Sequence, residues 1–138
     1  MRAIKIMLFI VISSVMSSVY AQSYQDVKKA MTKASQVAVA GFRESRVSGM
    51  IEKIAECYAQ LSKKMFYCSY IDIASRYIEL TVSQVMGYSP SQFFTDDSFS
   101  DRMSEIFERA NMDIDQANEY LSLISPEINE LVDIELSK

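Results

Sequence analysis

Residues 66–86 constrain the fold more than any other part of the sequence, because they form a long, mostly apolar segment with helical spacing. The polar residues inside it recur every three or four positions, so they fall on one narrow face of a helix. These residues are Ser69, Asp72, Arg76, Glu79 and Ser83. A helix that is apolar around most of its circumference is buried by neighbours on more than one side. The segment therefore predicts the central helix of a helical bundle.

Side chains on the polar face of this helix are close enough to pair along its surface. Asp72 and Arg76 lie four positions apart and Arg76 and Glu79 lie three apart, so we expect two local ion pairs. Tyr70 and Tyr77 lie nearby in the same segment. A buried face would make these residues a structural network, which we favour. A face that lines a groove would make Tyr70, Asp72, Arg76, Tyr77 and Glu79 a candidate binding surface.

The rest of the chain also has the apolar spacing of helices, separated by short turn signals. Gly41 and Gly49 indicate a break, and Gly87 indicates the end of the central helix. Serine-proline pairs at 89–90 and 125–126 indicate helix starts. The predicted helical segments are 23–39, 49–61, 66–86, a short turn after Pro90, 95–110, 113–124 and 126–136. We therefore predict an all-α bundle of about five to seven helices, in a single domain over residues 22–138.

Residues 1–21 have the layout of a secretory signal peptide. Arg2 and Lys5 give a positive start, residues 6–16 are mainly apolar, and Val19 and Ala21 precede the expected cleavage point. A membrane anchor is the alternative, but the apolar run is shorter than the roughly 20 residues that a spanning helix needs. We expect cleavage after Ala21 and export of residues 22–138 to the periplasm or beyond, with no membrane anchor left.

Cys57 and Cys68 are the only cysteines, and their spacing restricts how the chain runs between them. On one continuous helix they would lie roughly 16 Å apart, whereas a disulfide needs Cα atoms about 4.4–6.8 Å apart. An exported protein favours the disulfide, which requires the chain to turn back near residues 62–64. The alternative is two unpaired buried cysteines, because the apolar spacing continues through this region without Gly or Pro. We predict the disulfide.

Several classes of chemistry lack their residues. The chain has no histidine and three glycines, which excludes histidine-dependent triads and leaves no phosphate-binding loop. A structural zinc ion is bound by four N or S ligands, whereas this chain has two thiols and no histidine. Residues 111–115 begin like a calcium loop, but Gln116 and Ser122 replace its glycine and its last glutamate, so a helix cap is the better interpretation. We predict no metal, no cofactor and no enzyme activity.

The charge balance and the tyrosines favour a protein partner. Fourteen basic and eighteen acidic residues give a net charge of −4, which makes nucleic acid a poor ligand. Eight tyrosines and no tryptophan suit a protein interface, although tyrosine also fills core edges. We therefore expect a non-enzymatic, exported protein that binds another protein. One version is an inhibitor or immunity protein against an envelope-targeting toxin, and the alternative is a periplasmic stress chaperone or adaptor. A carboxylate-based hydrolase, with Asp96, Asp97, Asp101 and Glu105 as its candidate acids, ranks last.

A signal peptide followed by a small helical domain with one cysteine pair resembles the plan of the periplasmic immunity proteins that protect against type VI secretion amidases. The likeness lies in this plan alone, and no residue motif carries it. It implies a small helical fold that inhibits a toxic envelope enzyme by binding to it.

Overall fold

The computed structural model describes residues 2–138, with side chains from Ser23 onward, and this part of the chain is all-helical. Its elements are α1 (Arg2–Tyr58), α2 (Leu61–Met86), the 3₁₀ turn η1 (Gln92–Phe94), α3 (Asp96–Arg109) and α4 (Ile114–Leu136). No strand occurs among the described residues, so the predicted all-α class is confirmed. Four α-helices replace the predicted five to seven.

The described chain forms two compact units, residues 1–30 and residues 31–138, and each is considered by itself. The predicted signal peptide, residues 1–21, lies outside the residues whose side chains are described. The second unit contains the buried core and every surface discussed below. The predicted domain start at residue 22 stays a prediction.

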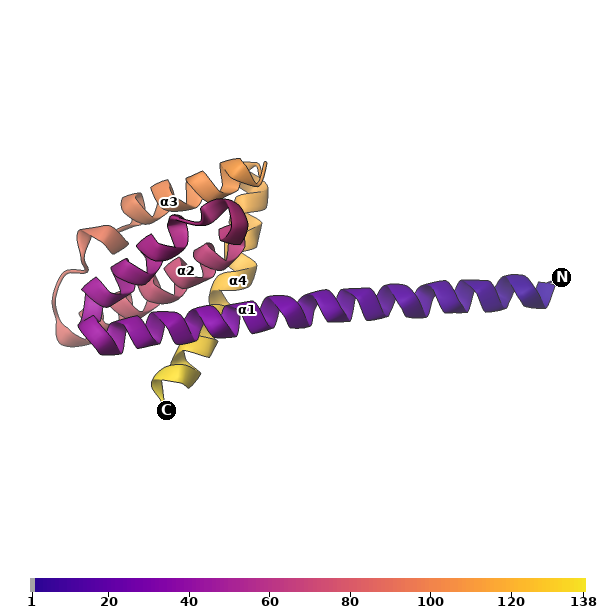
Figure 1. Ribbon diagram of the computed structural model, residues 1–138, viewed down its shortest axis with the longest axis horizontal. Coiled ribbons are helices and arrows are strands. Elements are labelled where there is room, and N and C mark those ends of the chain that lie inside the picture. The colour runs from indigo at the N-terminus through magenta and orange to yellow at the C-terminus, as the bar shows by residue number, and fades with distance from the viewer. Residues whose placement is uncertain (1) are drawn as a thin grey trace. The chain divides into compact units, whose positions relative to one another are not determined.

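α1 reverses direction inside the second unit, which explains part of the difference in helix number. Ser45 and Arg46 have non-helical backbone angles, and Arg46 has a positive φ of 57°. The chain turns back at this point (Figure 1), giving a first arm, residues 31–44, and a second arm, residues 47–58. The break that two glycines predicted near 41–49 is therefore present. Gly41 and Gly49 themselves lie where the two arms approach each other most closely.

The C-terminal part of the chain is one helix, α4, where the sequence predicted two. Pro126 lies inside it and does not end it. Proline removes the hydrogen bond that the carbonyl of Ser122 would accept, but Ser122 and Pro126 are both exposed, so water can satisfy that carbonyl. The prediction that the serine-proline pair at 125–126 starts a helix is therefore wrong. A proline that faces solvent destabilises a helix less than a buried one does, because water can bond the freed carbonyl.

α2 lies in the middle of the second unit. It contacts η1, α3 and α4, and the disulfide joins it to α1 (Figure 1). It begins at Leu61, earlier than the predicted residue 66, with a backbone break at Lys64. It ends at Gly87, whose left-handed conformation (φ 74°) lets its N–H bond the carbonyl of Ser83 at 2.9 Å. The fully buried side chains around it include Met31, Met50, Ile54, Ile78, Phe94, Met103, Ile106, Ile128 and Val132.

The segment that resembled a calcium loop is a helix cap. The Asp113 carboxylate accepts the backbone N–H of Gln116 at 2.8 Å, and the Gln116 side chain accepts the backbone N–H of Asp113 at 2.9 Å. This reciprocal pair is a capping box at the start of α4. The acidic side chain in this segment thus stabilises the first turn of a helix.

Candidate functional site

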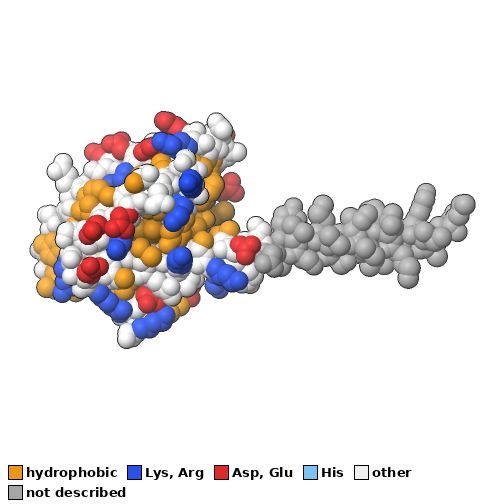
Figure 2. Space-filling view, viewed as in Figure 1, with side chains coloured by type: hydrophobic (Ala, Val, Ile, Leu, Met, Phe, Trp, Pro, Cys, Tyr) orange, Lys and Arg blue, Asp and Glu red, His pale blue; other side chains and the backbone are white. Residues whose placement is uncertain are grey.

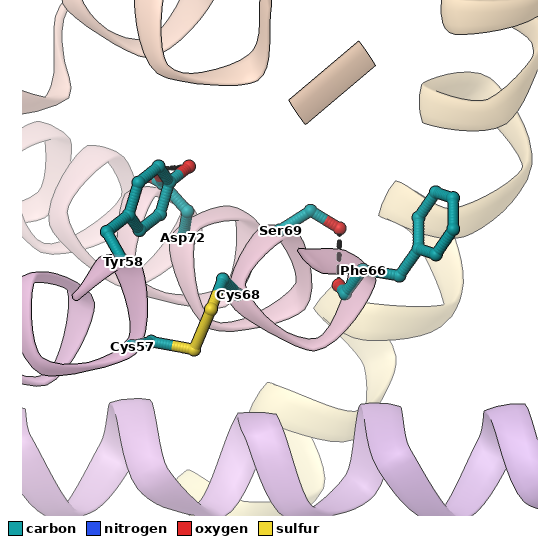
Figure 3. The surroundings of a disulfide bond; sticks show 6 residues. All are labelled: Cys57, Tyr58, Phe66, Cys68, Ser69 and Asp72. Carbon is teal, nitrogen blue, oxygen red and sulfur yellow. Dashed lines mark hydrogen bonds between the residues drawn. A yellow bond between two sulfur atoms is a disulfide. The ribbon is translucent and has the colours of Figure 1, made fainter. Parts of the chain in front are cut away.

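The two cysteines form a disulfide, as predicted from their spacing and the expected export. Cys57 near the end of α1 and Cys68 in α2 have Cα atoms 5.5 Å apart (Figure 3). The chain turns at residues 59–60, where the Gln60 N–H bonds the Cys57 carbonyl at 2.9 Å. A second backbone break follows at Lys64, so the change of direction begins earlier than the predicted residues 62–64 and ends within them. The disulfide joins the second arm of α1 to α2 in a short loop.

Replacing both cysteines by alanine should lower the free energy of unfolding by about 3 kcal/mol, because the unfolded chain regains the entropy of the opened loop. Urea denaturation of the wild type and of the C57A/C68A variant measures this difference. Reduction of the wild type by dithiothreitol should produce a similar loss, and the same reductant should leave the variant unchanged. A variant as stable as the oxidised wild type would contradict the prediction.

Asp72, one of the five candidate binding residues, belongs to a buried network. Its carboxylate is fully buried and accepts two bonds from Arg102 of α3, Nε to Oδ2 at 2.7 Å and Nη2 to Oδ1 at 2.8 Å. The Tyr58 hydroxyl donates to Oδ2 at 3.1 Å (Figure 3). Burial first, and the nearby Asp72 charge second, raise the pKa of Tyr58, so this hydroxyl stays a donor. Asp72 thus joins α1, α2 and α3.

Arg102 holds further groups in place besides Asp72. Its Nη1 donates to the carbonyls of Phe93 at 2.8 Å and Ser98 at 3.1 Å. Its guanidinium lies 3.8 Å from the centre of the Phe93 ring, a cation–π contact. The sequence did not indicate Arg102, which lies thirty positions from Asp72 and outside the central segment.

Glu79 is a second buried carboxylate of α2, and it bonds the segment that connects α2 to η1. It is 1% exposed, and its Oε1 accepts the backbone N–H of Ser91 at 3.0 Å. Ser91 in turn caps η1 by accepting the N–H of Phe93. The other carboxylate oxygen of Glu79 and the hydroxyl of Ser75 are buried without a hydrogen-bond partner among the described atoms. Glu79 therefore fixes the segment between α2 and η1.

The two predicted local ion pairs on α2 are wrong, because both charged partners come from other elements. Asp72 pairs with Arg102, as described, and Arg76 pairs with Asp96 at the start of α3. Arg76 also donates from Nε to the Phe94 carbonyl at 3.2 Å. A local pair on a helix surface contributes only about 0.2–0.5 kcal/mol, whereas a buried carboxylate requires a partner within the interior.

Arg76 and Tyr77 are the candidate residues that line a hollow. This pocket, about 330 Å³, lies between α2, α3 and α4 and also includes Leu80, Phe99 and Leu121. Arg76 is committed to Asp96 and lies 4.7 Å from the centre of the Phe99 ring. The Tyr77 hydroxyl donates to Asp133 at 3.0 Å. Tyr70 is buried instead, so the five candidate residues do not meet in one site.

One end of the second unit exposes large apolar side chains, two of which belong to the helix 66–86 that the sequence predicted to be buried. Val85, Met86 and Tyr88 are 79%, 69% and 45% exposed. Met86 and Tyr88 line a hollow of about 320 Å³ with Arg46 and three further apolar residues. We call the apolar residues of this region, Phe42, Val47, Val82, Val85, Met86 and Tyr88, the apolar tip. The turn at Arg46 brings α1 to the C-terminal end of α2. The apolar spacing of residues 66–86 did not indicate that Val85 and Met86 would stay exposed, whereas Tyr88 is one of the tyrosines that suited a protein interface.

A second hollow, about 360 Å³, lies between the two arms of α1 and the first part of α2. Lys33, Lys53, Lys64 and Glu56 are its charged residues, and Val37, Ala40, Cys57, Gln60, Tyr67 and Ile71 complete it. We call it the lysine groove. Figure 2 shows hydrophobic side chains gathered between charged ones on a face of this unit. The sequence did not indicate this groove, because its lysines come from three separate segments.

Neither a metal site among the described residues nor a match to a known protein indicates a function for this chain. Among residues 23–138, no group of three or more Asp, Glu, His or Cys side chains is placed to hold a metal ion. Over the same residues, no helix is long and apolar enough to span a membrane. No protein-family model, curated protein or solved structure matches the chain. The apolar tip and the lysine groove are therefore the surfaces that indicate a function.

Proposed function

We propose that this chain is an exported, non-enzymatic protein that binds a protein partner through its apolar tip. The observation that carries the proposal is the exposure of Val85, Met86 and Tyr88 next to a hollow lined by apolar side chains. Contiguous exposed apolar side chains mark interaction sites more often than isolated ones do. A hollow beside them offers a place for an anchoring side chain of the partner.

The version we favour is an inhibitor or immunity protein that covers an envelope-targeting toxin. The disulfide is compatible with export, and the predicted signal peptide would direct the chain to the cell envelope, where such a toxin acts. The turn at Arg46 and the Gly87 cap place the apolar tip at the ends of helices held by the core, and a preorganised surface loses little entropy on binding.

Two other functions explain fewer of these observations. A stress chaperone or adaptor would use the same exposed apolar side chains, but on many clients. A carboxylate-based hydrolase would need two acids converging on a cleft. In this fold Asp72 and Glu79 are buried in structural bonds, and Asp96 and Glu105 pair with arginines. Asp97 and Asp101 are exposed to solvent on α3 and line none of the hollows described above.

Charged substitutions at the apolar tip should abolish partner capture. The test uses the tagged full chain, expressed in its own host, captured from the envelope and identified by mass spectrometry. V85D/M86D should weaken the complex by about 30-fold or more, since central interface anchors contribute about 2 kcal/mol or more each. Leu123→Asp is the matched control, because Leu123 is 66% exposed on α4 and is absent from the hollow beside the apolar tip.

The number of captured proteins and their ratio to the chain distinguish a dedicated inhibitor from a chaperone. One dominant partner at a fixed ratio, lost with V85D/M86D and kept with L123D, supports a dedicated inhibitor or adaptor. Many clients in variable amounts favour the chaperone. Equal loss with both variants, or the same partner retained by V85D/M86D, contradicts binding through the apolar tip.

A further inference from the structure

We infer that the lysine groove binds an acidic peptide segment in which carboxylates alternate with apolar side chains. The inference deepens the proposed function and rests on it, since the segment would belong to the protein partner. The lysine groove would thus form a second contact with that partner, through charged groups, whereas the apolar tip binds through apolar side chains.

The groove concentrates uncompensated positive charge in an acidic protein. Lys53 forms an ion pair with Glu56 at 3.9 Å, which uses the only acidic residue of the groove. Lys33 and Lys64 have no ion pair among the described residues. The whole chain carries a net charge of −4, so two unpaired cations around one hollow are a local reversal of sign. Such a reversal attracts and orients an anionic partner.

The fold positions the three backbone segments that carry these lysines before any partner arrives. Lys33 belongs to the first arm of α1, Lys53 to the second arm and Lys64 to α2. The disulfide joins the second arm to α2 through Cys57, which itself lines the groove. The first arm is held to the second by the close approach of Gly41 and Gly49, so the three segments that carry the charges cannot separate freely. A preformed groove loses less entropy on binding than a flexible one.

The lining of the groove selects a peptide over a small anion. Val37, Ala40 and Ile71 provide apolar surface between the cations, and phosphate or a small carboxylate would leave this surface uncovered. Tyr67 also lines the groove, and a tyrosine hydroxyl is a hydrogen-bond donor at neutral pH. The volume of about 360 Å³ lies at the lower end of the range of ligand pockets. It accommodates a short segment with an apolar side chain between two acidic ones.

The test measures binding of a blocked, fluorescently labelled pentapeptide, Glu-Leu-Glu-Leu-Glu, to protein purified from cells that express the full chain. The control peptide has glutamine at each acidic position. We expect the acidic peptide to bind at least about fivefold more tightly, and this preference to decrease as salt is added. K33Q/K64Q should weaken acidic-peptide binding by about fivefold or more. Lys63→Gln is the matched control, because Lys63 is exposed next to Lys64 and does not line the groove.

The outcomes separate this inference from the proposed function. Equal affinity for the two peptides, or an equal effect of K63Q and K33Q/K64Q, overturns the inference. Tighter binding of inorganic phosphate than of the acidic peptide overturns it in favour of a small-anion site. If the peptide fails to bind while V85D/M86D still abolishes capture of one partner, only the inference fails. If the peptide binds by way of Lys33 and Lys64 while capture is empty, only the proposed partner fails. Circular dichroism of each lysine variant checks that the fold is retained.

Discussion

Arg102→Met should lower the free energy of unfolding by about 3–5 kcal/mol, because it leaves the Asp72 carboxylate buried without its charged partner. Asp72 is fully buried, and Arg102 supplies both charged bonds to it. The remaining donor from a side chain, the Tyr58 hydroxyl, is neutral and makes one bond at 3.1 Å. The substitution also removes the bonds that Arg102 donates to two backbone carbonyls near η1.

Urea denaturation followed by circular dichroism measures this loss, and α3 supplies the matched control. Arg109 pairs with Glu105 at 3.0 Å on the surface, with both side chains 49% exposed. Arg109→Met should therefore cost less than about 1 kcal/mol. A loss from R102M as small as that from R109M would show that Asp72 finds solvent or another partner.

A double variant separates the cost of an unpaired charge from the value of the pair. Replacing both residues, as D72L/R102M, removes the buried charge together with its partner. Apolar replacement of a whole buried ion pair is often neutral or stabilising. We expect the double variant to be more stable than R102M. It should not exceed the wild type, because Tyr58 and the carbonyl of Phe93 also lose a partner.

The helices and the disulfide could be predicted because their determinants are local. The apolar spacing of residues 66–86 specifies a buried helix wherever its neighbours lie, and Gly87 ends it through its own backbone geometry. Cys57 and Cys68 are close enough in sequence that a disulfide requires only a tight turn. The predicted number of helices was wrong at Pro126, which lies inside α4. Whether a proline ends a helix depends on its exposure to solvent, and exposure depends on the tertiary structure.

The partner of Asp72 and the two surfaces could not be predicted, because they depend on contacts between distant segments. Arg76 is the nearest cation to Asp72 in sequence, yet the packing of α3 brings Arg102 to it. The lysine groove exists only because α1 reverses at Arg46 and the chain turns again after Tyr58, where the disulfide closes the turn. The apolar tip contains residues whose spacing fits a core helix, and only the end of the bundle leaves them uncovered.

Gly49→Ala should also be severely destabilising, by about 3 kcal/mol or more, because the arms of α1 leave no room for a methyl group. A Cβ atom built on Gly49 would lie 2.0 Å from the carbonyl oxygen of Gly41. That oxygen belongs to the backbone of a helix, so no side-chain rotation relieves the contact. The two arms would have to separate, and the buried side chains that they share, such as Ala38 and Met50, would lose contacts.

Gly87→Ala is the control that separates crowding from backbone conformation. Gly87 has a φ of 74°, but nothing lies within 4 Å of a Cβ built there. Its substitution should cost about 1–2 kcal/mol through the left-handed backbone alone. Gly49 has no positive φ, so a larger loss at Gly49 measures the closeness of the arms. Equal losses from the two variants would contradict tight packing between them.

The same variants connect the packing of α1 to the lysine groove. Gly41 and Lys53 are neighbours, since a Cβ on Gly41 would lie 3.2 Å from the Cγ of Lys53. Arms forced apart at Gly49 would therefore move Lys53 away from Lys33 on the first arm. G49A that still folds under native conditions should bind the acidic peptide less tightly than the wild type, whereas G87A should bind it equally well. Unchanged peptide affinity in folded G49A would mean that the groove does not depend on the close approach of the two arms.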